Sequence, residues 1–245
     1  MTADEALAAA RSFAVATLAE RLGGGGLVVV APHPDDESLG CGGLVAEACA
    51  QGRPTRIVVV SDGAGSHPAS KKYPRNRLRA LREAEARGAA SALGLAPRHV
   101  LFLRQPDRFV PSAGPRAEAA IRELAACAAS VGAKALFVSW RHDPHCDHQA
   151  SYVIAREAQR RLPGVSLYEY SIWGAALPPA ASVAPPAGGF RLAVDRHLAR
   201  KRRAIAAHRS QTTAMIDDAP RGFRLARADI ERLTAPYECF FEGAA

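Results

Sequence analysis

Short apolar runs rich in β-branched residues alternate with longer, alanine-rich stretches along most of this chain of 245 residues. Such runs predict strands of a parallel sheet, because a strand covered on both faces needs no polar residues in alternation. The predicted strands are Leu27–Ala31, Thr55–Val60, His99–Leu103, Ala135–Ser139 and Ser166–Trp173. The predicted helices are Leu44–Ala50, Arg77–Leu95, Arg116–Ser130, Ser151–Arg161 and Asp195–His208. Alternating strands and helices predict an α/β fold, a doubly wound and mostly parallel sheet with helices on both faces.

The length of the chain suits one domain with a large core. We expect residues 1–26 to form an N-terminal helix and a glycine-rich loop, and residues 27–245 to form the α/β core. Five cysteines without a CxxC pair predict reduced thiols. Since no run of about 18 uncharged apolar residues occurs, we expect no transmembrane segment and a cytoplasmic protein.

The formal net charge is +8. Clustered basic residues attract polyanions. However, no helix-turn-helix, zinc-finger or RNA-binding signature accompanies the charge, so we expect no nucleic-acid partner. Attraction of an anionic substrate or of a membrane surface stays open.

The segment that leaves the first predicted strand contains one histidine and three acids, His33 and Asp35–Glu37. In an open parallel sheet this is the edge where ligands bind. A dinucleotide-binding protein would have a glycine-rich loop here to hold pyrophosphate, whereas carboxylates repel phosphate and attract a cation. On its own, the segment could also be a simple helix N-cap.

A second polar segment, Trp140–His148, follows the fourth predicted strand and is expected at the same edge of the sheet. Hydrolytic zinc sites use three nitrogen or oxygen ligands and leave a position for water, and His33, Asp36 and His148 meet that count. Iron(II) would suit the same ligands. Taken alone, this second segment could be a solvated loop.

These residues resemble a known family. Ala31–Glu37, followed by His145-x-Asp147-His148, is similar to the motif pair of the PIG-L/LmbE-like deacetylases, zinc enzymes with a Rossmann-like fold that act on N-acetylglucosaminyl groups. Weaker matches cover most of the chain after Leu27, at Ser61–Gly63, Arg82-x-x-Glu85, Leu93–Gly94, Pro106–Asp107, Tyr168–Tyr170 with Trp173, Ala207–Gln211 and Tyr237–Glu238.

The resemblance implies roles for individual residues. His33, Asp36 and His148 would hold zinc, and Asp35 would be the general base that takes a proton from zinc-bound water. Protonated His145, supported by Asp147, would stabilise the oxyanion. The implied reaction removes the acetyl group from an N-acetylglucosamine-type amino sugar or glycoconjugate.

Three further residues match positions near the substrate in the family: Arg82, Asp107 and His208. Each has another interpretation from its local sequence. Arg82 could form a surface pair with Glu85 on one helix face, and His208 could cap a helix C-terminus. Cys146 departs from the family pattern, which more often has proline there.

Three other functions compete with deacetylation. An amidase that cleaves a larger amide, such as a thiol conjugate, would use the same chemistry. A metal phosphoesterase would need more carboxylates or a second metal. A basic polyanion-binding or membrane-surface-binding protein without catalysis would bind in a salt-sensitive way and ignore chelators.

Overall fold

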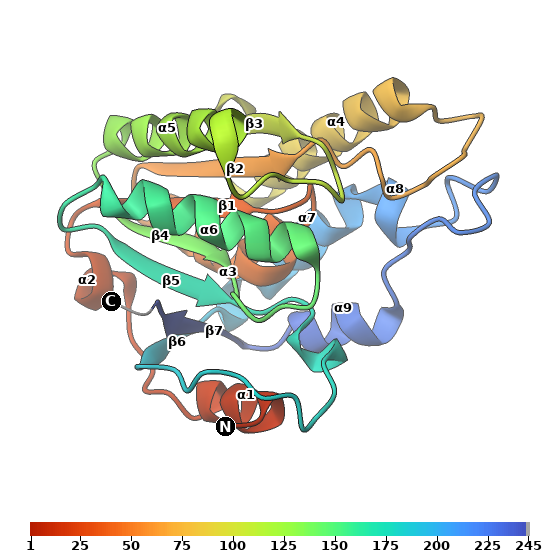
Figure 1. The fold of residues 1–245 in the computed structure, drawn as a ribbon. Helices are drawn as coiled ribbons and strands as arrows, with labels where there is room; N and C mark the ends of the chain where they lie inside the picture. Colours follow the sequence, from red (N-terminus) through yellow and green to blue (C-terminus); the bar gives the residue numbers. More distant parts are fainter. Residues whose placement is uncertain (244–245) are drawn as a thin grey trace.

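The computed structural model describes residues 1–243, so the last two positions of the predicted core lie outside the described residues. A seven-stranded sheet forms its centre, with helices on both faces (Figure 1). The strands are β1 (Gly26–Ala31), β2 (Thr55–Ser61), β3 (Val100–Gln105), β4 (Ala133–Ser139), β5 (Ser166–Tyr170), β6 (Gly189–Ala193) and β7 (Tyr237–Glu242). The helices are α1 (Ala3–Arg11), α2 (Leu18–Leu22), α3 (Asp36–Ala50), α4 (Arg75–Leu93), α5 (Gly114–Ser130), α6 (Cys146–Arg160), α7 (Leu198–Ala207), α8 (Arg209–Thr212) and α9 (Arg227–Leu233).

The strand order is β3-β2-β1-β4-β5-β7-β6. Strands β1 to β5 are parallel, while β7 runs antiparallel to both β5 and β6. From β1 the chain builds one half of the sheet through β2 and β3, then returns to place β4 on the other side of β1. The predicted doubly wound α/β fold is therefore confirmed, and its switch point lies between β1 and β4.

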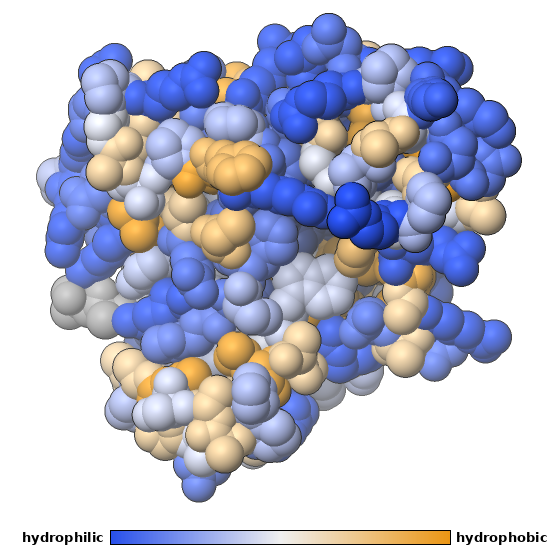
Figure 2. Space-filling view, turned by 45° about the vertical axis from the view of Figure 1, so that its right-hand side comes forward, coloured by the Kyte–Doolittle hydropathy of each residue, from blue (hydrophilic) through white to orange (hydrophobic). Residues whose placement is uncertain are grey.

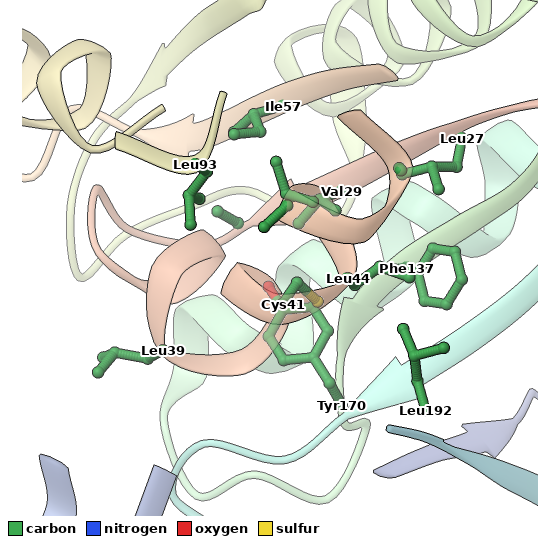
Figure 3. Close-up of a cluster of buried hydrophobic side chains, with 14 of the residues drawn as sticks. Leu27, Val29, Leu39, Cys41, Leu44, Ile57, Leu93, Phe137, Tyr170 and Leu192 are labelled. Atoms are coloured by element: carbon green, nitrogen blue, oxygen red, sulfur yellow. The ribbon is translucent and has the colours of Figure 1, made fainter. Parts of the chain in front are cut away.

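The central strand β1 is buried completely and contributes to two separate hydrophobic layers. Leu27, Val29 and Ala31 pack in the layer formed with α3, α4 and α7, part of which Figure 3 shows. Val28 and Val30 pack in the opposite layer with α5 and α6. Because consecutive side chains of a strand point to opposite faces, a β-branched run without polar residues fits a strand covered on both sides.

Helix α3 begins eight residues before the predicted start at Leu44. Glycines discourage helix formation, and Gly40, Gly42 and Gly43 lie in its first turns. Close packing explains their presence, because a Cβ at Gly40 would meet the Tyr170 ring at 2.2 Å and one at Gly43 would meet Val194 at 2.5 Å. Tertiary contacts therefore stabilise a helix that local preference disfavours.

Several other predicted boundaries were wrong. Strand β5 ends at Tyr170, before Trp173, and the predicted last helix divides into a 3-10 turn and α7, which the short helix α8 follows. The N-terminal segment holds two helices, and Gly26 already belongs to β1. Strands β6 and β7 and helix α9 were not predicted. Within residues 1–243, none of the helices combines the length and apolarity needed to cross a membrane.

Candidate metal centre and active site

The loops after β1 and β4 bring the predicted metal ligands together at the switch point of the sheet. The Oδ2 atom of Asp36 lies 3.3 Å from Nδ1 of His33 and 3.3 Å from Nε2 of His148. His145 adds a third imidazole, and the possible ligand atoms of His33, His145 and His148 all lie within 4.8 Å of one another. Two loops more than 100 residues apart in the sequence thus form one cluster.

The orientation of His148 fits a metal ligand. Its Nδ1 atom lies 3.1 Å from Oδ2 of Asp143, and the side chain is fully buried. Its Nε2 approaches Asp36 without hydrogen-bond geometry and has no hydrogen-bond partner among the described residues. A histidine that donates from one nitrogen to a carboxylate presents the lone pair of the other, which is the usual arrangement at zinc. The donor set therefore fits a divalent metal ion.

Carboxylates dominate the electrostatics of this cluster. Burial opposes ionisation of Asp36, but the neighbouring His148 and His33 outweigh it and hold the pKa of Asp36 well below its usual range. Burial would likewise lower the pKa of His148, yet the charge of Asp36 raises it to about 9. Asp107 and Asp147 similarly raise the pKa of His33 against its burial. The same negative field that favours protons on the imidazoles favours a divalent cation among them.

Asp143 is a functional candidate in the second polar segment, which from its sequence alone could be a solvated loop. It is fully buried, and its carboxylate accepts hydrogen bonds from Ser171 Oγ at 3.0 Å and from the amides of Ile172 at 3.0 Å and Trp173 at 3.3 Å, besides contacting His148. These bonds tie the loop after β5 to the predicted metal ligand His148. The loop interpretation of this segment was wrong, because its acids and His148 face inwards.

Asp35 adopts a strained backbone conformation, with φ 147° and ψ −29°. Non-glycine residues in such regions cost about 1–3 kcal/mol and cluster at functional sites. Burial raises the pKa of Asp35 to about 7, although the positive charge of Arg82 opposes this. Asp35 occupies the N-cap position of α3, as the N-cap interpretation expects, but its side chain caps no amide of that helix. A carboxyl group with a pKa near neutrality is suited to take up and release a proton.

Arg82 holds the loop that carries Asp35. Its guanidinium donates to the carbonyl oxygens of Pro34 at 2.7 Å and Gly63 at 2.9 Å, and to Oδ2 of Asp35 at 3.2 Å. The side chain is buried, so the predicted alternative of a surface pair with Glu85 was wrong. Both residues lie on the inner face of α4.

His145 begins α6 and accepts the Asp147 amide proton on Nδ1, at 3.1 Å. Its proton in the neutral form is therefore on Nε2. Burial and the charges of His33 and His148 lower the pKa of His145, which favours that neutral form. The Asp147 carboxylate, expected to support His145, instead accepts from the amide of Arg108 at 2.6 Å and contacts His33 Nε2 at 3.1 Å.

The two remaining predicted residues, and Cys146, take different positions. Asp107 lies beside the cluster, with Oδ1 at 3.5 Å from His33 and Oδ2 accepting from the Gly65 amide at 2.7 Å. His208 is the C-cap of α7 and contacts Glu37 at 2.8 Å, and it does not line the cavity described below. Cys146 is an exposed residue. Partial burial of its thiol and the charge of Asp147 raise the pKa of that thiol.

A cavity of about 330 Å³ opens beside the cluster. Figure 2 views the molecule from the side of the carboxyl ends of the parallel strands, where apolar residues stand among hydrophilic ones. The lining residues include His33, Asp35, Asp36, Arg82, Asp107 and His145, together with Gly65, Ser66, Arg108, Pro144, Trp173, Ala176, Gln211 and Phe223. Six of the nine predicted site residues therefore line one cavity. The other three, His148, Asp147 and His208, do not.

Solved structures share this fold. N,N'-diacetylchitobiose deacetylase from Pyrococcus horikoshii is 18% identical over 95% of this chain and 88% of its own, with a TM-score of 0.70. The zinc-inhibited form of teicoplanin deacetylase Orf2 is 16% identical over 74% of this chain and 83% of its own, with a TM-score of 0.60. At these identities the likeness shows the fold alone.

The same fold also occurs in an enzyme of another class. The 4-carboxy-2-hydroxymuconate hydratase GalB from Pseudomonas putida is 23% identical over 74% of this chain and 77% of its own, with a TM-score of 0.57. The fold therefore does not decide the reaction.

None of the curated proteins matches this chain in sequence. The family model described as PIG-L, GlcNAc-PI de-N-acetylase, matches residues 28–159. That range is more than half of the chain and contains both polar loops of the cluster, and the predicted resemblance is thereby confirmed: this chain belongs to the PIG-L family.

Proposed function

We propose that this protein is a zinc-dependent deacetylase that hydrolyses the N-acetyl group of an N-acetylglucosamine-type amino sugar or glycoconjugate. The observation that carries the proposal is the buried His148, whose Nε2 is free beside Asp36 while Asp143 fixes its other nitrogen. Family membership and the deacetylase activities named for two of the structures with the same fold support it.

His33, Asp36 and His148 would hold the ion. When bound, zinc supplies a Lewis acid that polarises the amide carbonyl and activates water, and iron(II) would suit the same ligands. Three carboxylate or imidazole ligands leave room for water and substrate.

Asp35 lines the cavity and can take the proton from the attacking water. Its position is fixed by Arg82, which binds both its carboxylate and the preceding carbonyl. His145 donates from Nε2 to the oxygen that gains negative charge, a role that the neutral imidazole can fill. Asp35 then gives its proton to the leaving nitrogen as the C–N bond breaks, so that acetate and the free amine result.

The test combines metal content with product release. Purified protein should contain about one zinc or iron per chain and release acetate from N-acetylglucosamine conjugates, and chelation should abolish the release until metal is restored. A larger amide that is cleaved faster than any acetamide would favour the amidase alternative. Protein that binds no metal and stays inert after zinc or iron is added would refute the proposal.

Asp35→Asn separates the general base from the ligands. We expect turnover to fall about 10²–10⁴-fold, with metal content unchanged. Asp4→Asn is a matched control on exposed α1, outside the cavity lining. Full activity of Asp35→Asn would remove Asp35 from the mechanism.

A further inference from the structure

The cavity has a polar base, and its mouth combines exposed apolar residues with the exposed Arg108. At the base, the residues Asp35, Arg82 and Asp107 are almost completely buried, at 5%, 2% and 4% exposure. Phe223, which lines the same cavity, is 37% exposed. A substrate whose acetamide reaches the base can therefore extend its outward part along the side of the cavity that Phe223 forms.

Two aromatic rings close this side. Trp173 and Phe223 meet edge to face, with ring centroids 5.8 Å apart and an angle of 87° between the planes. Ala176 and Pro144 add apolar surface to the lining. Aromatic rings offer large apolar area for contact and favour other aromatic groups in stacked or edge-to-face geometry.

Main-chain hydrogen bonds position the two residues that carry these rings. The amide of Trp173 donates to Asp143, the residue that orients His148, at 3.3 Å. The amide of Phe223 donates to the carbonyl of Ser66 in the loop after β2, at 2.8 Å. The aromatic wall therefore joins the loop after β5 to the segment between α8 and α9, and hydrogen bonds connect it to Asp143 and to the loop after β2.

A second set of contacts fastens the segment that carries Phe223. The carboxylate of Asp218 accepts from Ser70 Oγ at 2.6 Å and from the amides of Lys71 and Lys72 at 2.8 Å each. Gly222 lies against His67, and a Cβ there would approach the imidazole at 2.4 Å. Asp218 thus acts through other residues, as a positioning residue for the wall.

We propose that Trp173 and Phe223 form a binding subsite for an apolar, aromatic aglycone of the substrate. The inference rests on the proposed deacetylase function and narrows its substrate class to N-acetyl amino sugars whose anomeric substituent carries a ring. The polar base binds the reacting acetamide, while the wall contacts the part of the substrate that extends towards solvent. An isolated sugar would leave this apolar wall in water, and an aromatic substituent would cover it.

The experiment compares the phenyl and methyl β-glycosides of N-acetylglucosamine with the metal-loaded protein. We expect kcat/KM to be about tenfold higher for the phenyl glycoside, the scale of discrimination available from a hydrophobic pocket. Phe223→Ala should reduce this ratio to near one, and Phe223→Leu should give an intermediate ratio. Phe109→Ala is the matched control, because Phe109 is 78% exposed and does not line the cavity.

Binding gives an independent measurement. The chain has two tryptophans, and Trp140 is buried at 3% exposure, so a change of tryptophan fluorescence on adding the phenyl glycoside reports on Trp173. Asp218→Asn should raise KM for the phenyl glycoside more than it changes kcat. These results would support the subsite.

Three outcomes would contradict it. Equal kcat/KM for the two glycosides would overturn the proposal, and so would a Phe223→Ala variant that lowers both values equally, since the ring would then contact the sugar itself. Acetate release from neither glycoside would refute the deacetylase function. In that case, absence of a fluorescence change with the phenyl glycoside would also refute the subsite, whereas a change that Phe223→Ala removes would retain it.

Discussion

Replacing Asp143 by alanine should weaken metal binding although Asp143 is not a predicted ligand. The substitution removes the hydrogen-bond partner of His148 Nδ1, so the ring loses its fixed orientation. Loss of such a partner typically lowers metal affinity about 10–100-fold, which corresponds to about 1.4–2.7 kcal/mol of binding free energy. The amides of Ile172 and Trp173 also lose their acceptor, and each unsatisfied amide costs about 1–3 kcal/mol of stability.

The assay separates the two effects. Metal affinity is measured by competition with a chelator at constant pH, and stability by denaturant unfolding of the metal-free protein. Asp143→Asn is the matched variant, because its amide oxygen can replace Oδ2 opposite His148, Ile172 and Trp173 without the negative charge. It should lose less stability than Asp143→Ala. If Asp143→Ala lowers stability but changes metal affinity less than twofold, Asp143 does not orient the ligand and only organises the loop after β5.

Two further predictions concern stability. Gly43→Ala should lower the free energy of unfolding by about 1–3 kcal/mol, because the new methyl group overlaps Val194. Gly88→Ala, in open space on α4, should raise it by about 0.5–1 kcal/mol. Similar denaturation midpoints for both variants would contradict the packing argument. Although burial opposes it, hydrogen bonds from Arg196 lower the pKa of Glu47 from 4.5 to about 2, so this carboxylate stabilises the fold above pH 4.5 and the contribution is lost as the pH falls to about 2. Glu47→Gln should therefore unfold more easily than the wild type at pH 7, and thermal melts should show the gap closing towards pH 2; a gap independent of pH would refute the ion pair as its cause.

The parallel part of the sheet was predictable because its central strands β1, β2 and β4 each contain a buried apolar run. Strands β6 and β7 were not predicted, because neither is a clear apolar run bounded by turn residues. Strand β6 follows an irregular segment rich in proline and glycine, and β7 (Tyr237–Glu242) begins and ends with exposed or polar residues. Strand β6 is defined mainly by its pairing with β7, and β7 by its pairing with β6 and with β5, both of which lie far before it in the sequence.

The place of the candidate site in the fold could be predicted from the order of strands and loops. The two polar loops could be placed at one sheet edge because both follow parallel strands, and the distances around Asp36 agree with that placement. Asp143 could not be assigned because its partners in the loop after β5 lie 28 to 30 residues further along. The burial of Arg82 could not be predicted either, since its carbonyl partners belong to the loops after β1 and β2.

The position of β7 between β5 and β6 has a consequence for how the protein folds. β7 follows all other helices and strands of the described chain, yet β6 reaches the sheet only by pairing with it. Glu238 of β7 also accepts protons from the Gly43 and Leu44 amides in α3, the helix that begins at Asp36. Since translation proceeds from the N-terminus, the sheet beyond β5 and the contacts of α3 stay incomplete in a nascent chain until β7 has been synthesised. Pairing over so many residues slows folding, and the exposed edge of β5 is the place where a chaperone or a misdirected strand would bind first.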